Sequence, residues 1–392
     1  MLISIEEGRR RVLEAARALD TEPVPLAEAR GRVLAEDLKS AVDVPPFDSS
    51  AMDGYALVAG PATELEVVGE SRAGHPSDRP VAPGVAVRIS TGAAVPPGAT
   101  AVIPVERTSE NGTRVKVEET AEGANIRRSG EDLRAGEVVL AAGTVLGAAE
   151  LGVAASVGRA ELRCARRPRV ALLVTGDELV QPGEPLGAGQ IYTSNGFALA
   201  AQIEGAGGEL VLHETVPDAA EDTHGALERA LGAADVVVAS GGVSVGPHDH
   251  VKGALRKLEV EERFWGVALR PGKPTWFGTR GGVLVFGLPG NPVSAMVTFQ
   301  LFGRPALAAL QGADPAARRA PAALDEPVRR NPRREQAVRV RLRHADDGLH
   351  ARTTGEQGSH MLTSMLGAEA LALVAAGEGE LGAGERVEVQ LL

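Results

Sequence analysis

Short apolar runs alternate with helical segments between about residues 170 and 310, and this alternation constrains the fold more than any other feature of the chain. The runs of strand length lie at 170–174, 209–212, 235–239 and 283–286, and the helical patterns lie near 195–204, 219–231, 250–258 and 292–310. Strands that alternate with helices form a parallel sheet, whose ligand loops meet at the carboxyl edge. We therefore predict an α/β domain with its functional loops at that edge.

The loop after the third strand carries the strongest chemical signal. Its sequence at 240–249 is SGGVSVGPHD. Glycines such as Gly241 and Gly242 let the backbone approach a ligand and point N–H groups at phosphate oxygens, and Ser244 adds a hydroxyl. This pattern predicts a phosphate-binding loop.

Two carboxylates flank the same edge. Asp249 follows the glycine loop, where it would repel a bound phosphate unless a divalent cation lay between them. Asp218 follows the second strand, so the parallel arrangement brings it close. We therefore predict a Mg²⁺ site formed by both carboxylates. Without the glycine loop, helix capping alone would be the simpler interpretation of either residue.

The turn after the first strand has the sequence TGDEL at 175–179. It presents the hydroxyl of Thr175, the amide of Gly176 and the carboxylate of Glu178. An ordinary helix N-terminus with acidic residues in its first turn would have the same sequence. The turn therefore indicates a ligand contact only in combination with the glycine loop.

Two further loops supply cations or donors. RPGKP at 270–274 holds Arg270 and Lys273 close together on a backbone stiffened by prolines, which a multivalent anion between them would stabilise. GLPGNPVS at 287–294 turns into the last helix with Ser294 near its free N–H groups. Either segment alone could be a solvated surface loop. Their coincidence with the glycine loop favours an anion site.

The rest of the chain divides around this domain. A first helix starts at the capping signal SIEE at 4–7 and runs to about Leu19. Short β-type runs at 85–89, 101–105 and 114–117 predict a small β domain, and a helix at 148–157 follows it. A DG signal at 347–348 and a run at 386–391 predict a β-rich C-terminal domain. The predicted domains are 1–42 together with 143–168, 43–142, 169–318 and 319–392.

Composition excludes several classes of protein. No apolar run reaches the roughly 20 residues of a spanning helix, so we expect a cytoplasmic protein with no membrane partner. Cys164 is the only cysteine, which excludes a disulfide framework or a cysteine-based metal cluster within one chain. A net charge of −11 and 3% aromatic residues argue against nucleic acid as a partner.

A series of motifs resembles the molybdopterin molybdenumtransferases, or molybdenum insertases, which include the bacterial MoeA proteins and the E domain of gephyrin. The motifs are FDSSAMDGYA at 47–56, STGA at 90–93, RSGED at 128–132, TGDEL at 175–179, SGGVSVG at 240–246, PGKP at 271–274, GLPGNPVS at 287–294 and TGEQGSH at 354–360. Eight motifs in one order, spanning nearly the whole chain, make the resemblance specific. Arg270 stands where the family loop usually has Lys, which preserves the charge.

The resemblance implies a fold of four parts. These are a central three-layer α/β domain of the molybdopterin-adenylyltransferase type, an inserted β domain, an N-terminal linker region of helix and extended chain, and a small barrel-like C-terminal β domain. It implies an enzyme that inserts molybdate into adenylylated molybdopterin with Mg²⁺ and releases AMP and molybdenum cofactor. It also implies a homodimer with a composite active site, with a molybdopterin adenylyltransferase and apo-molybdoenzymes as further protein partners.

The matching motif positions assign roles to residues. Catalytic roles fall to Asp53, Thr91, Asp132, Glu178, Asp218, Asp249 and Lys273. Thr175, Gly176, Glu178, Gly241, Gly242, Ser244 and Asp249 are expected to contact the pterin nucleotide. Asp218 and Asp249 are expected to bind Mg²⁺. Contacts with molybdate fall to Arg270, Lys273, Pro274, Ser294, Arg339 and Ser359. Of these, Asp53, Thr91 and Asp132 are expected to face the α/β domain of the partner subunit.

Three alternatives stay open at the level of sequence. The α/β fold also permits the adenylyltransferase reaction itself, although a stand-alone adenylyltransferase does not need β domains at both ends. A carrier or scaffold would hold finished cofactor without catalysis. Tungstate has nearly the same size and charge as molybdate and could be the physiological oxyanion.

Overall fold

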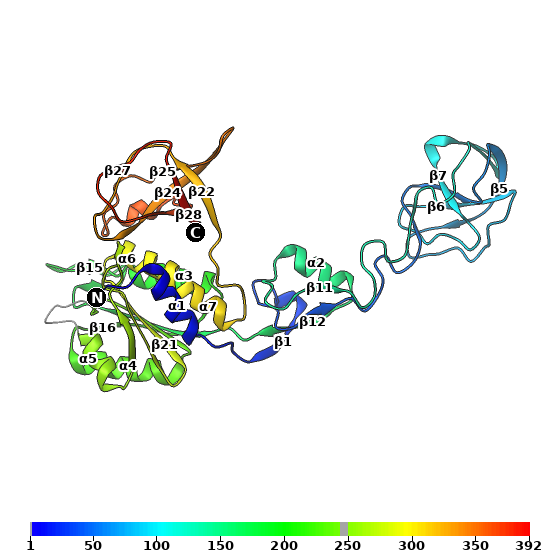
Figure 1. The fold of residues 1–392 in the computed structure, drawn as a ribbon. Helices are drawn as coiled ribbons and strands as arrows, with labels where there is room; N and C mark the ends of the chain where they lie inside the picture. The colour runs from blue at the N-terminus through cyan, green and yellow to red at the C-terminus, as the bar shows by residue number, and fades with distance from the viewer. Residues whose placement is uncertain (1, 244–249) are drawn as a thin grey trace.

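The computed structural model describes residues 2–243 and 250–392. They form an elongated molecule with a large lobe, a narrow middle region and a small β lobe at the far end (Figure 1). The chain runs from the large lobe through the middle region to the β lobe and returns by the same route. We propose domain boundaries at 1–42 with 143–168, 43–142, 169–318 and 319–392.

Helix α1 (Ile5–Ala15) packs against the large lobe. The Ser4 hydroxyl accepts the N–H of Glu7 at 3.0 Å and caps the helix as predicted. The helix ends about one turn before the expected Leu19, because the Leu19 N–H bonds to the carbonyl of Leu310 instead. This bond carries the chain away from the helix axis toward the middle region.

The middle region consists of paired outgoing and returning segments. Strand β1 (Thr21–Pro25) pairs antiparallel with β12 (Glu161–Ala165), and β2 (Leu38–Lys39) pairs with β11 (Val138–Leu140). Helix α2 (Ala148–Ser156) and the 3-10 turn η1 (Leu26–Glu28) cover these pairs. A small apolar core that includes Leu34, Leu146 and Leu162 joins them, so the connector is itself a folded unit.

The β lobe contains a six-stranded sheet in the order β7-β4-β6-β5-β9-β8. Its strands are β4 (Gly54–Leu57), β5 (Thr63–Ser71), β6 (Val85–Ile89), β7 (Ala101–Pro104), β8 (Thr108–Asn111) and β9 (Arg114–Val117). The turn η2 (Val105–Arg107) links β7 to β8, and β3 (Ser49–Ser50) pairs with β10 (Ile126–Arg127) beside the sheet. The predicted small β domain is therefore confirmed.

The α/β domain has a six-stranded sheet in the order β16-β13-β17-β21-β20-β18. The four predicted strands are parallel and adjacent: β13 (Arg169–Thr175), β16 (Glu209–Val216), β17 (Val236–Ser240) and β21 (Val283–Leu288). Two further strands were not predicted: β20 (Trp276–Arg280), which pairs antiparallel with β21, and β18 (Glu261–Trp265), which pairs antiparallel with β20 and forms the edge of the sheet. A small parallel pair, β14 (Leu179–Val180) and β15 (Ile191–Tyr192), precedes α3.

Helices cover both faces of this sheet. Helix α3 (Asn195–Gly205) and the helical segment 292–310 share one apolar core with α1, and α4 (Ala220–Ala233) and α5 (His250–Lys257) share the core on the opposite face. The central strands β13, β17 and β21 are almost fully buried, as Val170, Leu172 and Val238 illustrate at 0% exposure. This is the predicted three-layer arrangement.

One helical segment of the described chain is long and apolar enough, by length and composition, to cross a membrane. It runs from Pro292 to Leu310 as α6 (Pro292–Thr298), a π-helical turn (Phe299–Gly303) and α7 (Arg304–Leu310). Within the fold, 78% of its apolar window is buried, and it packs against α1 and α3. The segment is therefore a core helix of the large lobe.

The C-terminal domain is a closed five-stranded barrel. Strands β22 (Arg319–Leu324), β25 (Gly348–Thr353), β24 (Glu335–Ala345), β26 (Ala370–Val374) and β28 (Arg386–Leu391) pair in a ring. The pair β23 (Val328–Arg329) and β27 (Glu380–Leu381) and the turn η4 (Leu362–Met365) lie outside the ring. Strand β19 (Leu269–Arg270) pairs with β24 and places Arg270 beside Gln336, which links the α/β domain to the barrel.

A histidine between two carboxylates makes one contact of this barrel dependent on pH. His350 Nδ1 lies 2.9 Å from Asp325 Oδ1, and its Nε2 lies 2.8 Å from Asp347 Oδ1. Hydrogen bonds to Asp347 and then Asp325 raise the pKa of His350 above its usual value of 6.5. A raised pKa gives stability that is complete below the unfolded-state pKa and is lost as the pH rises through the folded-state pKa.

We therefore expect His350→Gln to lower the midpoint of thermal unfolding at about pH 6 and to have little effect at about pH 9. Circular dichroism melts at the two pH values measure this difference. An equal loss at both pH values would contradict the assignment.

Candidate active site

Three loops meet at the carboxyl edge of the parallel strands. The last residues of β17 and β21, Ser240 and Leu288, are cross-strand partners, and β13 lies on the other side of β17. Asn195, the first residue of α3, joins the loops because its Nδ2 donates to Ser240 Oγ at 3.0 Å and to the carbonyl of Gly290 at 2.7 Å. The predicted meeting of loops at one edge is confirmed.

The glycine loop lies directly against the end of β13. Gly241 has a φ of +97°, and a Cβ at this position would lie 2.6 Å from Thr175 Oγ1 and 2.8 Å from the Thr175 carbonyl oxygen. Gly242 has a φ of +65°, and a Cβ there would lie 2.7 Å from Val251 Cγ2. Both the backbone conformation and the close approach therefore require glycine.

We expect Gly241→Ala to lower the free energy of unfolding by about 1–3 kcal/mol, because the added methyl group meets backbone atoms in a left-handed conformation. Gly253→Ala is the matched control: Gly253 lies within α5 and a Cβ there meets nothing within 4 Å. Urea denaturation compares the two variants. The steric argument fails if Gly241→Ala is as stable as Gly253→Ala.

The hydroxyl of Thr175 has no hydrogen-bond partner among the described residues, although its Oγ1 is buried. A buried polar group without a partner costs roughly 1–3 kcal/mol. This hydroxyl lies at the point where β13 meets the glycine loop. The position therefore favours an acceptor supplied by a ligand, such as a phosphate oxygen.

An acidic cluster lies beside these loops. The N–H of Asp218 donates to Asp177 Oδ1 at 2.9 Å, and the Glu178 carboxylate folds back over Gly176, where a Cβ would lie 2.7 Å from Glu178 Oε2. Burial, together with the charges of Asp177 and Glu178, raises the pKa of Asp218. A cation bound here would relieve this concentration of negative charge.

The predicted metal pair is described only in part. Ser244 and Asp249 lie outside the described residues, so only Asp218 of the two predicted Mg²⁺ ligands is placed. Within residues 2–243 and 250–392, no three His, Cys, Asp or Glu side chains gather in a way that would hold a metal ion. The Mg²⁺ site therefore stays a prediction.

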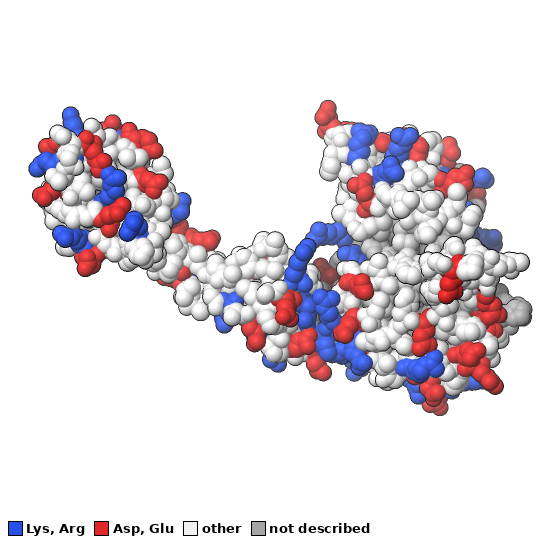
Figure 2. Space-filling view, turned by 180° about the vertical axis from the view of Figure 1, so that it is seen from behind, with Lys and Arg blue, Asp and Glu red and all other residues white. Residues whose placement is uncertain are grey.

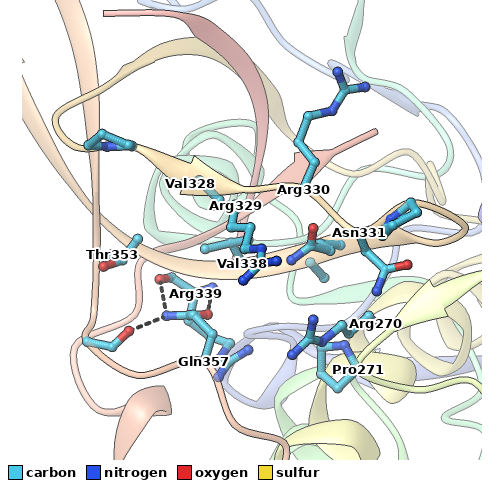
Figure 3. A pocket seen from close by; sticks show the side chains of 15 residues that line it. Arg270, Pro271, Val328, Arg329, Arg330, Asn331, Val338, Arg339, Thr353 and Gln357 are labelled. Atoms are coloured by element: carbon cyan, nitrogen blue, oxygen red, sulfur yellow. Dashed lines mark hydrogen bonds between the residues drawn. The ribbon is translucent and has the colours of Figure 1, made fainter. Parts of the chain in front are cut away.

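A pocket of about 490 Å³ lies between the 270–274 loop and the barrel (Figure 3). Four arginines line it: Arg270, Arg329, Arg330 and Arg339. None of the described residues that line it is acidic, and none of these four arginines pairs with a described carboxylate, whereas Arg319 and Arg343 of the same barrel do. Positive charge without counter-charge indicates an anion site.

Arg339 is the buried cation of this pocket. Its side chain is 1% exposed, and its Nε and Nη2 donate to Ser364 Oγ at 3.2 and 3.0 Å. Burial, followed by repulsion from Arg270, lowers the pKa of Arg339 to about 10, so the guanidinium still carries its charge at neutral pH. A buried cation with only neutral described partners favours an anionic ligand.

The other predicted oxyanion residues lie outside this pocket. They are Lys273, Pro274, Ser294 and Ser359. Lys273 is exposed on the loop that follows Arg270, and Ser294 is buried in the first turn of α6. Ser359 Oγ accepts a hydrogen bond from Asn291 Nδ2 at 3.2 Å, which docks the barrel loop on the start of α6. Ser359 also follows Gly358, whose carbonyl accepts a hydrogen bond from Arg339 Nη2 at 3.4 Å, so the same barrel loop contacts both α6 and the arginine pocket.

The three predicted residues of the β lobe lie far from both groups. Asp53 Oδ1 accepts the N–H of Thr91 at 2.8 Å, so these two are in contact. Asp132 donates its N–H to the carbonyl of Val44, at the entrance to the β lobe. Figure 1 places this lobe at the opposite end of the molecule from the α/β domain. One chain as described does not bring the two groups together.

Several pocket residues were not predicted from the sequence. They are Arg329, Arg330, Asn331, Gln336, Thr353 and Gln357. A signal was present, because four arginines occur within the six residues 329–334. Repulsion by Arg270 and Arg333, after burial, lowers the pKa of Arg334 in the same run. Basic runs are usually solvated surface, and only the barrel closure turns this one toward Arg270.

Three family profiles match the chain in order along its length. Residues 3–158 match the MoeA N-terminal region, domains I and II. Residues 171–309 match a molybdopterin binding domain described as probable, and residues 321–392 match the MoeA C-terminal region, domain IV.

Similar proteins and structures extend over the same range. A molybdopterin molybdenumtransferase of Haemophilus influenzae is 37% identical over 99% of this chain and 98% of its own length. Molybdopterin molybdenumtransferase 2 of Mycobacterium tuberculosis is 41% identical over 79% of this chain and 80% of its own length. The crystal structure of the molybdopterin biosynthesis MoeA protein of Pyrococcus horikoshii OT3 covers 100% of both chains, with 31% identity and a TM-score of 0.85. The chain therefore belongs to the molybdopterin molybdenumtransferase (MoeA) family and is a transferase.

Proposed function

We propose that the protein inserts molybdate into adenylylated molybdopterin with Mg²⁺, releasing AMP and molybdenum cofactor. The observation that carries this proposal is the arginine pocket, which lies between the 270–274 loop of the α/β domain and the barrel. Molybdate is a tetrahedral dianion, and guanidinium groups bind such anions through charge-assisted hydrogen bonds. Molybdate is chosen as the anion because the relatives of this chain are named molybdopterin molybdenumtransferases.

The oxyanion is expected to contact Arg270 and Arg339 first. Arg339 is fixed by Ser364 at the base of the pocket, and β19 holds Arg270 opposite it. Ser359 contacts Asn291 at the start of α6, and Gly290 before it lies beside Gly241. Lys273, Ser294 and Ser359 would therefore hold the oxyanion closer to the pterin. Pro274 would stiffen the backbone next to Lys273.

The pterin nucleotide is expected at the carboxyl edge of the sheet. Gly241 and Gly242 bring backbone N–H groups to this edge, and the buried Thr175 hydroxyl has a donor to offer a phosphate oxygen. Cleavage of the link to AMP develops charge on phosphate oxygens, and fixed donors stabilise such charge without reorganisation. Glu178 follows β13 and Lys273 precedes β20, so the two residues lie on either side of β17 and β21 in the strand order.

The residues at the acidic cluster are compatible with Mg²⁺. Mg²⁺ is usually held by one or two carboxylates together with substrate phosphates, so a three-carboxylate cage is not required. The raised pKa of Asp218 shows that its carboxylate lies in an environment that disfavours a further negative charge. Asp218, with Asp249, would hold the ion, which when bound neutralises phosphate charge.

We also propose a homodimer whose active sites combine both subunits. The contact between Asp53 and Thr91 shows that two of the β-lobe motifs form one surface. Since that lobe lies at the far end of its own chain, the α/β domain of a second copy is the surface it would complete. Asp132 lies at the entrance of the same lobe.

We further place this reaction in the cytoplasm, with a molybdopterin adenylyltransferase as the donor of substrate and apo-molybdoenzymes as acceptors of product. Figure 2 shows acidic and basic side chains interspersed over both lobes of the face it presents. Such a surface suits transient protein contacts better than a nucleic acid backbone.

An assay with an apo-molybdoenzyme distinguishes an enzyme, which needs only the substrates, from a carrier, which needs finished cofactor. Incubation of the protein with adenylylated molybdopterin, molybdate and Mg²⁺ should yield cofactor that activates an apo-molybdoenzyme. A carrier would activate the apo-enzyme only when finished cofactor is added. Replacement of molybdate by tungstate in the same assay tests which oxyanion is preferred, and formation of adenylylated molybdopterin from ATP would instead support the adenylyltransferase reaction.

A further inference from the structure

Trp265 lies on the edge strand β18, which was not predicted from the sequence, and contacts the glycine loop. It is the last residue of β18, and its indole Nε1 donates to the carbonyl oxygen of Val243 at 3.1 Å. Val243 is 2% exposed, and a Cβ on Gly287 would lie 2.6 Å from its Cγ1. The carbonyl that Trp265 binds therefore belongs to the last described residue of the loop, and that residue is anchored in the core.

The same indole contacts the chain where it resumes. Lys252 lies in the first turn of α5, and its Nζ is 4.3 Å from the centroid of the Trp265 ring. This is a cation–π contact of ordinary distance. Lys252 and Val243 lie on either side of residues 244–249, so one side chain contacts both flanks of that segment.

The two flanks also contact each other. A Cβ at Gly242 would lie 2.7 Å from Val251 Cγ2, so the residue before Val243 packs against the residue before Lys252. Val243, Val251 and Trp276 share one apolar cluster, against which Trp265 packs. The flanks are thus held by side-chain packing on the inner side and by the Trp265 indole on the outer side.

We propose that Trp265 is a positioning residue for Gly241, Gly242 and Val243, and that it sets the affinity of these residues for the nucleotide through its contacts with Val243 and Lys252. The proposal rests on the proposed function, because it takes the glycine loop as the nucleotide site. Trp265 itself need not touch the substrate. Its effect is preorganisation: backbone N–H groups of Gly241 and Gly242 that are held in place before binding lose less conformational freedom when the ligand arrives.

The sheet offers a matched control for this indole. Trp265 and Trp276 are cross-strand partners, and they are the two tryptophans of the chain. Trp276 Nε1 donates to Glu262 Oε2 at 2.7 Å, on the strand and away from the glycine loop. Phe keeps an aromatic ring in the apolar cluster at either position. Trp265→Phe and Trp276→Phe therefore each remove one indole N–H from the same strand pair, but only the first removes a bond to Val243.

Binding of AMP with Mg²⁺ to the purified full-length chain, measured by isothermal titration calorimetry, tests the proposal. Loss of one neutral hydrogen bond to the loop should weaken binding about fivefold in Trp265→Phe. Lys252→Met should weaken it about two- to fivefold through loss of the cation–π contact. Trp276→Phe should bind within about twofold of the unsubstituted protein. With adenylylated molybdopterin, Trp265→Phe should raise KM by the same factor and leave kcat within about twofold.

Fluorescence provides a readout that general destabilisation would not produce. Trp276→Phe leaves Trp265 as the single tryptophan, and its emission should change with AMP concentration in a saturable way. Trp265→Phe leaves Trp276, whose emission should not respond. The reverse pattern, or a response of both tryptophans, would overturn the proposal.

The outcomes separate this proposal from the function on which it rests. If the unsubstituted protein binds no AMP, the nucleotide site itself is misplaced. If it binds AMP and Trp265→Phe binds equally well, the positioning role is wrong and the nucleotide site stands. Equal losses in the two Trp→Phe variants would also overturn the role. If Trp265→Phe does not fold, Lys252→Met decides, and unchanged affinity in that folded variant contradicts the proposal.

Discussion

Substitution of Arg339 by Met is expected to lower molybdenum insertion about 100- to 1,000-fold while the protein stays folded. The guanidinium is 1% exposed, faces Arg270 across the pocket and has no described carboxylate partner. An anion bound there would make charge-assisted hydrogen bonds that no other buried group of the pocket replaces. Saturating molybdate should not restore the rate if the bound geometry depends on this residue.

The fold should tolerate the same change. Replacement of a buried charge by an apolar side chain of similar length is often neutral or stabilising, whereas Ser364 loses a donor. We expect the free energy of unfolding to change by no more than about 2 kcal/mol. Arg341→Met on the same strand is the control, because Arg341 is exposed and does not line the pocket. Equal loss of activity in both variants, or full activity in Arg339→Met, would contradict the assignment.

Two inactive variants are expected to restore activity when they are mixed. In the proposed homodimer, Asp53 of one chain serves the α/β domain and barrel of the other. Asp53→Ala and Arg339→Met should each be inactive alone. A mixed dimer would contain one intact site, which takes its β lobe from the Arg339→Met chain and its arginine pocket from the Asp53→Ala chain. Random reassembly should therefore recover about a quarter of the normal activity.

The mixing experiment also has a built-in control. Asp53→Ala mixed with Thr91→Ala should stay inactive, because both changes affect the same surface. Activity is measured after unfolding and joint refolding of equal amounts of the two chains. Absence of recovery, with mixed dimers present by mass spectrometry, would show that each site is built within one chain.

Much of the α/β domain could be predicted because its strands and loops follow local rules. The apolar runs near Val170, Leu210, Val236 and Val283 became parallel strands, since continuous apolar sequence is buried on both faces. The antiparallel edge was missed because β18 reads EERFW, with its charged residues on an exposed edge and no alternation of polar and apolar positions. The segment is a strand because it pairs with β20, and its own sequence pattern does not indicate this.

In the candidate site, too, some residues could be predicted from the sequence and others could not. Gly241 and Gly242 could be assigned from sequence because only glycine fits their backbone conformation and close packing. The arginine pocket could not be assigned, because Arg329 and Arg339 approach Arg270 only after the barrel closes and β19 pairs with β24. The long distance between Asp53 and the α/β domain is likewise set by the paired strands of the middle region, and no local sequence motif indicates it.

Release of AMP from adenylylated molybdopterin tests the proposed function most directly. We expect the purified protein to release AMP only when both molybdate and Mg²⁺ are present, in equal amount to the molybdenum incorporated into the pterin. Lys273→Ala and Asp249→Ala should each reduce this release by at least about tenfold. Release that is indifferent to molybdate and Mg²⁺, and that survives both substitutions, would contradict the proposed function.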